Sequence, residues 1–128
     1  MIAGLAAISE WPEARMLIAQ SVERDDAVTL AEVEEALAAN LAQLWTVRDG
    51  GLVLAAVTQL LALKSGRQAY VWQMGGDFER GGEALVATFL AWARSEDCVT
   101  AEMNGRLGWR KKLPDWQVVT VTLRKELR

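Results

Sequence analysis

The chain has 128 residues and a net charge of −3, and 52% of its residues are hydrophobic, which excludes a disordered chain and suits one domain over residues 1–128. The absence of histidine and the single cysteine, Cys98, exclude internal disulfides and histidine-assisted nucleophiles, so we expect no metal site and a reducing compartment. The apolar runs are too short to cross a bilayer and no cationic leader precedes them, which predicts a protein that is neither secreted nor transmembrane.

The first third of the chain predicts a short strand followed by two helices. Trp11-Pro12-Glu13 is typical of a helix start, since proline suits a first turn and an acidic side chain suits the positive end of the helix dipole. A second helix is predicted to begin at the capping box Thr29–Glu32. Its expected apolar stripe consists of Leu30, Val33, Leu37, Leu41 and Leu44. Both helices are expected to pack on a sheet.

Three antiparallel strands are predicted next. Residues 44–48 and 52–58 flank Asp49-Gly50-Gly51, a strong hairpin pattern, and the second strand is expected to continue to Leu63. A turn then leads into a strand from Gln68 to Met74. The glycine-rich turn that follows joins this strand to an amphipathic helix, predicted from Glu83 to Arg94.

The last part of the chain predicts two strands around a short helix. Cys98–Met103 should lie parallel to the strand before the preceding helix, because such crossovers are right-handed and return to the same sheet. A short helix or turn is predicted over Gly105–Leu113 and is stopped by Pro114, and a closing strand is predicted over 116–127. The order indicates an α+β fold with a mixed, mostly antiparallel central sheet and helices on both faces.

This order of elements, with four local patterns, resembles the GNAT (GCN5-related N-acetyltransferase) fold. The patterns are the hairpin Trp45–Gly50, the strand end Val71–Gly76, the helix start Arg80–Leu85, and Asn104–Trp109 followed by Leu113. More narrowly, the chain is similar to small GNAT-like proteins encoded among the virion genes of tailed bacteriophages, including internal virion proteins. That likeness implies a GNAT-like domain found in the host cytoplasm or in the virion.

In that family, the turn after the fourth strand holds the pyrophosphate of acetyl-CoA with backbone amides. Its pattern is Gln or Arg, two residues of any kind, a glycine, one further residue, and a glycine or alanine. Gln73–Gly76 begins this pattern, but Phe78 occupies its last position, where a side chain would block the phosphate. A start at Arg80 instead places Glu83 at the first glycine, where its charge would repel a pyrophosphate. The family's late-helix tyrosine, which protonates the leaving thiolate, has no counterpart here, since the single tyrosine is Tyr70.

These departures favour a non-catalytic GNAT-like phage protein that acts as a virion-associated, internal or assembly component. It would work through contacts with other virion proteins or with itself, without a cofactor. The alternative is an acyl-CoA-dependent N-acetyltransferase with a divergent pyrophosphate loop, in which Glu79 or Glu102 would be the base. Acetyl-CoA would then lie against Val71, Gln73, Gly75, Gly76, Arg80, Gly81 and Gly82. A third hypothesis is a small-ligand or nucleotide sensor that uses the same turn. The glycines could also serve only a tight turn, and the acidic residues only helix capping.

The C-terminal end is basic, with seven basic and two acidic residues from Arg106 onward. Tryptophan and arginine are enriched at protein interfaces, and Trp109 is expected to be partly exposed between Arg106 and Arg110. The candidate interaction patch consists of Arg106, Trp109, Arg110, Lys111, Lys112 and Trp116. No nucleic-acid-binding signature accompanies it, so nucleic acid is not an expected partner. The alternative interpretation is that the tryptophans close the core edge and the cations are merely solvated.

Overall fold

The computed structural model describes residues 2–105 and 108–128. The elements follow in the order β1 (Ile2–Ala6), η1 (Ile8–Glu10), α1 (Trp11–Val22), α2 (Leu30–Ala38), β2 (Gln43–Arg48), β3 (Leu52–Leu63), β4 (Gly66–Gly76), η2 (Phe78–Arg80), α3 (Gly82–Ser95), β5 (Cys98–Met103) and α4 (Trp109–Lys112). The strands form one sheet in the order β1-β2-β3-β4-β5. Among the strands of the described residues, only β4 and β5 pair in parallel, so the predicted mixed, mostly antiparallel sheet is confirmed.

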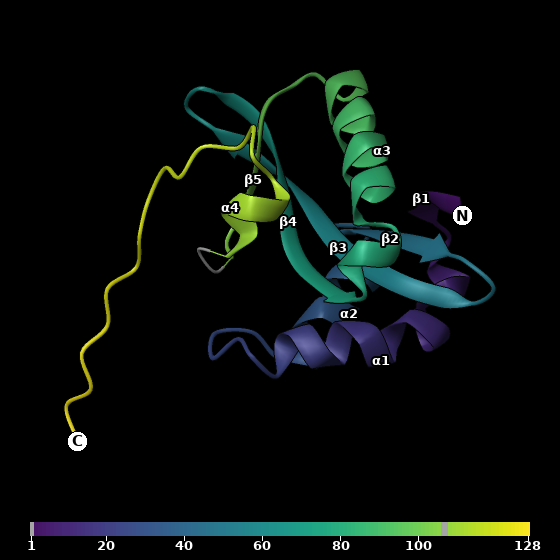
Figure 1. The fold of residues 1–128 in the computed structure, drawn as a ribbon, viewed down its shortest axis with the longest axis horizontal. Coiled ribbons are helices and arrows are strands. Elements are labelled where there is room, and N and C mark those ends of the chain that lie inside the picture. Colours follow the sequence, from purple (N-terminus) through teal and green to yellow (C-terminus); the bar gives the residue numbers. More distant parts are fainter. Residues whose placement is uncertain (1, 106–107) are drawn as a thin grey trace.

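The helices cover both faces of the sheet (Figure 1). Side chains alternate between the faces along each strand, and two core clusters result. Trp45 and Val47 of β2 pack with Leu85 and Phe89 of α3 on one face. On the other face, Leu44 packs with residues of α1 and α2. The sheet is therefore buried on both sides over its central strands.

The predicted hairpin and capping box are both confirmed. The ladder between β2 and β3 runs from Gln43–Thr58 to Arg48–Leu52 around the tight turn. At the start of α2, the Thr29 hydroxyl accepts a hydrogen bond from the Glu32 backbone N–H over 3.2 Å. Such a cap satisfies one of the donors that a helix N-terminus leaves free.

The predicted apolar stripe of the second helix is wrong at its last two members. The helix ends at Ala38, and Asn40 has a φ of +63°, which turns the chain out of the helix. Leu41 is consequently exposed, whereas Leu44 lies in β2 and is buried. The regular spacing of apolar residues continues from α2 into β2, so periodicity alone cannot show where the helix ends.

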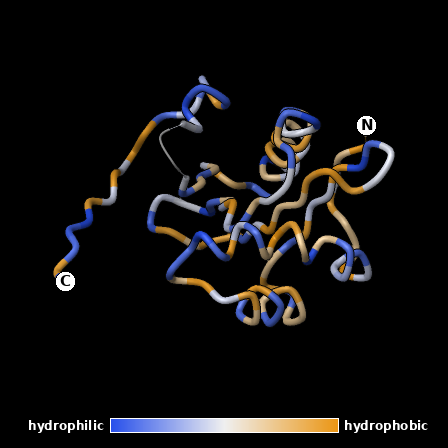
Figure 2. The backbone as a smooth tube through the Cα atoms, turned by 60° about the horizontal axis from the view of Figure 1, so that its bottom comes forward, coloured by the Kyte–Doolittle hydropathy of each residue, from blue (hydrophilic) through white to orange (hydrophobic). Residues whose placement is uncertain are grey.

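The predicted closing strand over 116–127 is also wrong. Residues 113–128 form no strand, and residues 117–128 are all exposed. The end of the chain extends away from the body of the molecule (Figure 2). Val119, Val121 and Leu123 are all exposed. These residues have the composition of a strand, but their backbone groups pair with no other strand. A strand forms only when its backbone groups find hydrogen-bond partners.

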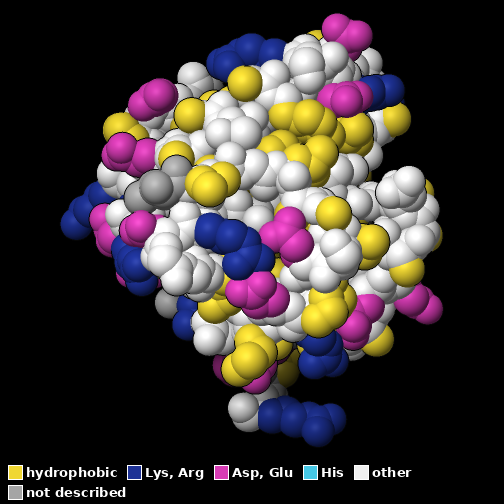
Figure 3. All heavy atoms as spheres, turned by 90° about the vertical axis from the view of Figure 1, so that its right-hand side faces the viewer, with side chains coloured by type: hydrophobic (Ala, Val, Ile, Leu, Met, Phe, Trp, Pro, Cys, Tyr) yellow, Lys and Arg dark blue, Asp and Glu magenta, His cyan; other side chains and the backbone are white. Residues whose placement is uncertain are grey.

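At the opposite end of the sheet, β2 is the one strand of the described residues that pairs with β1. Its side chains Ile2 and Leu5 are exposed, and so is Ile8 in η1. Figure 3, which faces this end of the molecule, shows hydrophobic side chains at the surface among acidic and basic ones.

Candidate functional site

The turn between β4 and α3 rests on close backbone contacts. Gly76 has a φ of +115°, and a Cβ added there would lie 2.4 Å from the backbone oxygen of Val53. A Cβ on Gly75 would lie 1.8 Å from the backbone oxygen of Leu17 in α1. The Asp77 backbone N–H also donates a hydrogen bond of 2.8 Å to the Val53 carbonyl. Both glycines are therefore required for β4 to pack on β3 and α1, whether or not the turn binds a ligand.

Phe78 fills the space in front of the first residue of α3. A Cβ added to Gly82 would lie 2.3 Å from the Phe78 ring. The ring meets Trp109 of α4 edge to face, with ring centroids 4.9 Å apart. The Lys112 ammonium lies 5.5 Å from the Phe78 centroid and 4.9 Å from the Trp109 centroid, within cation–π range. The Phe78 ring therefore occupies the space beside Gly82, next to the turn where its side chain is expected to block a phosphate.

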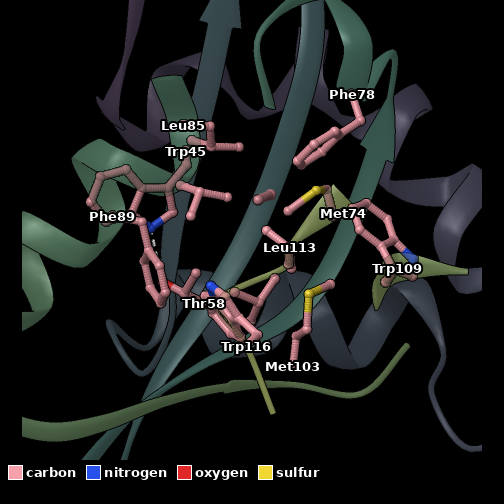
Figure 4. A pocket seen from close by; sticks show the side chains of 13 residues that line it. Trp45, Thr58, Met74, Phe78, Leu85, Phe89, Met103, Trp109, Leu113 and Trp116 are labelled. Carbon is pink, nitrogen blue, oxygen red and sulfur yellow. Dashed lines mark hydrogen bonds between the residues drawn. The ribbon is translucent and has the colours of Figure 1, made fainter. Parts of the chain in front are cut away.

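Strands β4 and β5 separate after their last paired residues, Val71 and Met103. The gap beyond this point is closed by side chains, which leave an apolar cavity of about 10 Å³. Figure 4 shows the side chains that converge on it, among them Met74, Phe78, Met103, Trp109, Leu113 and Trp116. That volume is near the lower limit for one water molecule, roughly 10–15 Å³. The space between the two strands is thus filled by the protein itself.

A wider groove of about 440 Å³ lies between the end of α1, the turn and α4, next to the side chains that fill the gap between β4 and β5. Two basic side chains line it, Arg24 and Lys112, and two acidic ones, Asp77 and Glu79. Gly75 and Gly76 form part of its wall. The groove could therefore accept a polar group at the backbone of the turn, with mixed charge around it. Sequence reasoning missed Arg24, because nothing in its local sequence indicates that the end of α1 reaches this turn.

At three of the positions against which acetyl-CoA is expected to lie, the side chains make contacts within the protein, and cofactor binding by the backbone amides there stays a prediction. Val71 is buried in the core. Gln73 is buried too; its amide oxygen accepts from the Ser21 hydroxyl, and its amide nitrogen donates to Asp25 over 3.1 Å. Arg80 donates to the Asp49 backbone oxygen over 3.0 Å. Gln73 thus connects β4 to α1, and Arg80 connects the turn to the β2–β3 hairpin.

The two candidate bases lie in different surroundings. Glu79 is exposed in η2, and one of its carboxylate oxygens is 3.9 Å from the Lys112 ammonium. Glu102 lies on β5 and accepts a hydrogen bond of 2.9 Å from the Gln68 amide. Tyr70, opposite Glu102 in the ladder, has a pKa raised by burial and further by the charges of Asp25 and Glu102. A raised pKa makes a phenol a weaker proton donor, so Tyr70 is not activated by its surroundings.

The single cysteine is not activated either. Burial raises the pKa of the Cys98 thiol, and this effect outweighs the nearby Arg67. A raised pKa reduces the thiolate fraction at neutral pH, and the thiolate is the reactive form.

The predicted interaction patch divides into two parts. Trp109 and Trp116 are half-buried and line the cavity between β4 and β5. Arg110 and Lys111 are exposed, and Lys112 lies over the aromatic rings. Trp109 is thus partly exposed, as predicted. Arg106 lies outside the described residues. The two tryptophans help to close the gap between β4 and β5. This placement agrees with the alternative interpretation, in which they close the edge of the core.

Neither a metal-binding cluster nor a membrane-spanning helix occurs in the described part of the chain. Within residues 2–105 and 108–128, no three His, Cys, Asp or Glu side chains come together in a group that could hold a metal ion. None of the helices there is long and apolar enough to cross a membrane.

Comparison with known proteins gives the fold. No protein-family model matches the sequence, and no curated protein matches it. Among solved structures, a tetramutant of the BH1408 protein from Bacillus halodurans is similar, with a TM-score of 0.74 and 14% identity over 99% of this chain and 100% of that one.

Two acetyltransferase structures are similar at the same level. A predicted acetyltransferase with acetyl-CoA from Clostridium acetobutylicum has a TM-score of 0.70 and 14% identity, over 98% of this chain and 96% of that one. An aminoglycoside N-acetyltransferase in complex with CoA has a TM-score of 0.71 and 15% identity, over 99% of this chain and 95% of that one. At such identities the likeness concerns the backbone and not the chemistry. The chain therefore has the GNAT acetyltransferase fold.

Proposed function

We propose that this chain is a non-catalytic GNAT-fold protein that acts through protein contacts. The observation that carries the proposal is the Phe78 ring, which lies against Gly82 and is backed by Trp109. This ring occupies the part of the turn where the family presents backbone amides to a pyrophosphate. Side chains also fill the gap between β4 and β5. Glu79, a candidate base, lies within ion-pair distance of Lys112.

Opening the turn for a cofactor would require Phe78 to leave both Gly82 and Trp109. An edge-to-face aromatic pair contributes about 0.5–1.5 kcal/mol beyond the area that it buries, and the Lys112 ammonium adds a cation–π contact. A cofactor would have to offset these contacts before it gained any binding energy. The arrangement therefore favours a closed turn.

The partners we propose are other virion or assembly proteins, or a second copy of the chain. The resemblance to phage virion-gene products motivates this choice. Arg110 and Lys111 are exposed on α4 and could meet an acidic partner surface. Contacts of this kind weaken as salt is added, because exposed charges are screened.

The proposal is tested by calorimetric titration with acetyl-CoA. The wild-type chain should bind with a Kd of 1 mM or weaker, which corresponds to a binding free energy no more favourable than about −4 kcal/mol. Phe78→Ala restores the last position of the family pattern and should bind more tightly than wild type, whereas Phe78→Leu keeps a bulky side chain there and should not. Wild-type binding at micromolar Kd, about −8 kcal/mol, would overturn the proposal.

An acyl-CoA-dependent N-acetyltransferase is the second candidate, and one observation favours it. The groove of about 440 Å³ places Arg24 and Lys112 beside the backbone of Gly75 and Gly76, so a phosphate there would meet two cations. Some similar structures hold acetyl-CoA or CoA. If this candidate is right, Arg24→Ala should weaken acetyl-CoA binding, and Arg15→Ala, at an exposed position on α1, should not.

A further inference from the structure

The pair Asn104-Gly105 follows directly after Met103, the last residue of β5. Both residues are exposed, and both line an open groove of about 580 Å³ between β5 and the chain that follows α4. The sequence has one other asparagine, Asn40, which is also exposed and is followed by leucine. The two asparagines are therefore alike in exposure and differ in the residue that follows.

An asparagine side chain can react with the backbone nitrogen of the next residue, and asparagine is thermolabile in part for this reason. The backbone nitrogen attacks the side-chain Cγ and gives up its proton to solvent, while the amide group takes up a proton and leaves as ammonia. A five-membered succinimide ring results. Water then opens the ring at either of its carbonyl carbons and leaves an aspartate or an isoaspartate. Water enters and ammonia leaves, so the reaction needs no oxidant, reductant or cofactor.

The chain around Asn104 favours ring closure. Gly105 has no Cβ, so its backbone nitrogen can rotate toward the Asn104 side chain without a side-chain clash. The ladder between β4 and β5 ends at the pair Val71–Met103, which leaves Asn104 beyond it. Because both residues are exposed, water can reach the ring that forms.

The chain around Asn40 opposes the same reaction. The Leu41 backbone N–H donates a hydrogen bond of 2.8 Å to the Ala36 carbonyl, so the nitrogen that would attack is already held. The Asn40 backbone N–H in turn bonds the Leu37 carbonyl over 3.2 Å, in a turn where Asn40 has a φ of +63°. The side chain of Leu41 adds a steric hindrance that glycine lacks. The fold therefore restrains the attacking nitrogen at Asn40.

Packing explains why a glycine stands at position 105. A Cβ added there would lie 2.8 Å from Cδ1 of Trp109, so the indole or the end of β5 would have to shift. Trp109 and Met103 both line the cavity between β4 and β5 (Figure 4). The glycine that permits ring closure is thus the residue that lets Trp109 pack close to the end of β5.

We propose that Asn104 is a site of spontaneous deamidation, which converts its amide to a carboxylate in the folded protein. The product is negatively charged, since a carboxyl group has a pKa well below neutral. The groove is already lined by the acidic Glu102 and Asp115 and the basic Arg110. A further carboxylate there weakens the attraction of Arg110 for an acidic partner surface. The site does not depend on whether acetyl-CoA binds.

The isoaspartate product also changes the backbone. In isoaspartate the chain runs through the former side-chain carbon, so the connection from β5 to α4 becomes longer by a carbon atom. Gly105 lies directly against Trp109, and Trp109 packs edge to face on Phe78. The longer connection is therefore expected to loosen the aromatic contacts of Trp109.

Peptide mapping by mass spectrometry of the full-length chain tests the proposal. After incubation in mildly alkaline buffer, Asn104 should convert to the acid at least about tenfold faster than Asn40, because only Asn104 precedes a glycine. In urea, conversion of Asn40 should accelerate by about threefold or more, since its neighbour loses a backbone hydrogen bond, whereas conversion of Asn104 should change less. An Asn104 that converts no faster than Asn40 in the folded protein, or that converts only in urea, would overturn the proposal.

A second measurement separates the added charge from the longer backbone. Asn104→Asp carries the charge alone, and Asn104→Gln is the matched control, because its longer side chain cannot form the five-membered ring. The isoaspartate form, isolated by chromatography after incubation, should unfold at a temperature about 3 °C or more below that of Asn104→Asp. Incubated Asn104→Gln should keep its thermal midpoint. Equal midpoints for the isoaspartate form and Asn104→Asp, or an equal loss in Asn104→Gln, would overturn the link to Trp109.

Discussion

Strand β4 is closed on its two sides by different means. On the β3 side, a backbone ladder continues from Leu63–Gly66 to the end of the strand at Leu54–Gly76. On the β5 side, pairing ends at Val71–Met103, and aromatic and aliphatic side chains fill the rest of the gap. Where two backbones are in direct contact, an added side-chain atom must push them apart. Where side chains fill a gap, a smaller side chain can be introduced without moving the backbone. Substitutions at the close contacts of β4 with α1 should therefore cost more stability than trimming the side chains that fill the gap next to β5.

The largest loss of stability is expected from Gly75→Ala. The new Cβ would meet the Leu17 backbone oxygen at 1.8 Å, so β4 and α1 would have to move apart. We expect the free energy of unfolding, measured in urea, to fall by about 3 kcal/mol or more. Gly51→Ala is the matched control, because a Cβ there meets nothing within 4 Å, and it should change stability by less than about 0.5 kcal/mol. Equal effects would refute the close contact.

Gln73→Ala should have the next largest effect. The substitution leaves the Ser21 hydroxyl and the Asp25 carboxylate without the buried amide that joins β4 to α1. Loss of such a partly buried network costs about 1–3 kcal/mol, measured by urea unfolding. Gln20→Ala, on the exposed face of α1, serves as control and should be nearly neutral. A neutral Gln73→Ala would mean that the bonds between α1 and β4 are not formed in solution.

A smaller effect is expected from Trp109→Ala on the plugged side. Trp109 is half-buried, so losing its contact with Phe78 should cost about 1–2 kcal/mol, below the loss expected for Gly75→Ala. Thermal unfolding of this variant and of Arg110→Ala, exposed on the same helix, would measure the difference. A Trp109→Ala variant that does not fold would show that the aromatic plug is as essential as the backbone ladder.

The smallest effect concerns the ion pairs that join the end of β2 to α1. The Arg48 guanidinium hydrogen-bonds Glu13 at 2.7 Å and holds the pKa of that carboxyl below its ordinary value of 4.5. A pKa lowered by folding means that the contribution is present above pH 4.5 and is lost as the pH falls through the lower, folded-state value. The stability difference between wild type and Arg48→Gln should therefore be small at pH 7 and vanish in acid. A difference that grows in acid would contradict the pairing.

Local patterns predicted most of the elements correctly. The Asp49-Gly50-Gly51 turn and the Thr29 cap act within a few residues of themselves, so their structures could be predicted without knowing what they pack on. The apolar stripe through Leu41 and Leu44 was misassigned, because Asn40 turned the chain out of the helix while the spacing of apolar residues stayed regular. Phe78 was identified as an obstruction from its place in the family pattern, but its contact with Trp109 joins elements far apart in sequence.

The sequence by itself determined the local elements and the fold class, because helix caps, turns and alternating apolar residues depend on neighbours along the chain. The distant contacts of the turn could not be predicted from the sequence. Gln73 and Arg80 occupy positions of the family's phosphate-binding pattern, and only the folded chain shows that their side chains also bond α1 and the hairpin, which come from distant parts of the sequence. The same reason applies to residues 116–127: their composition favours a strand, but a strand forms only when another edge supplies partners for its backbone.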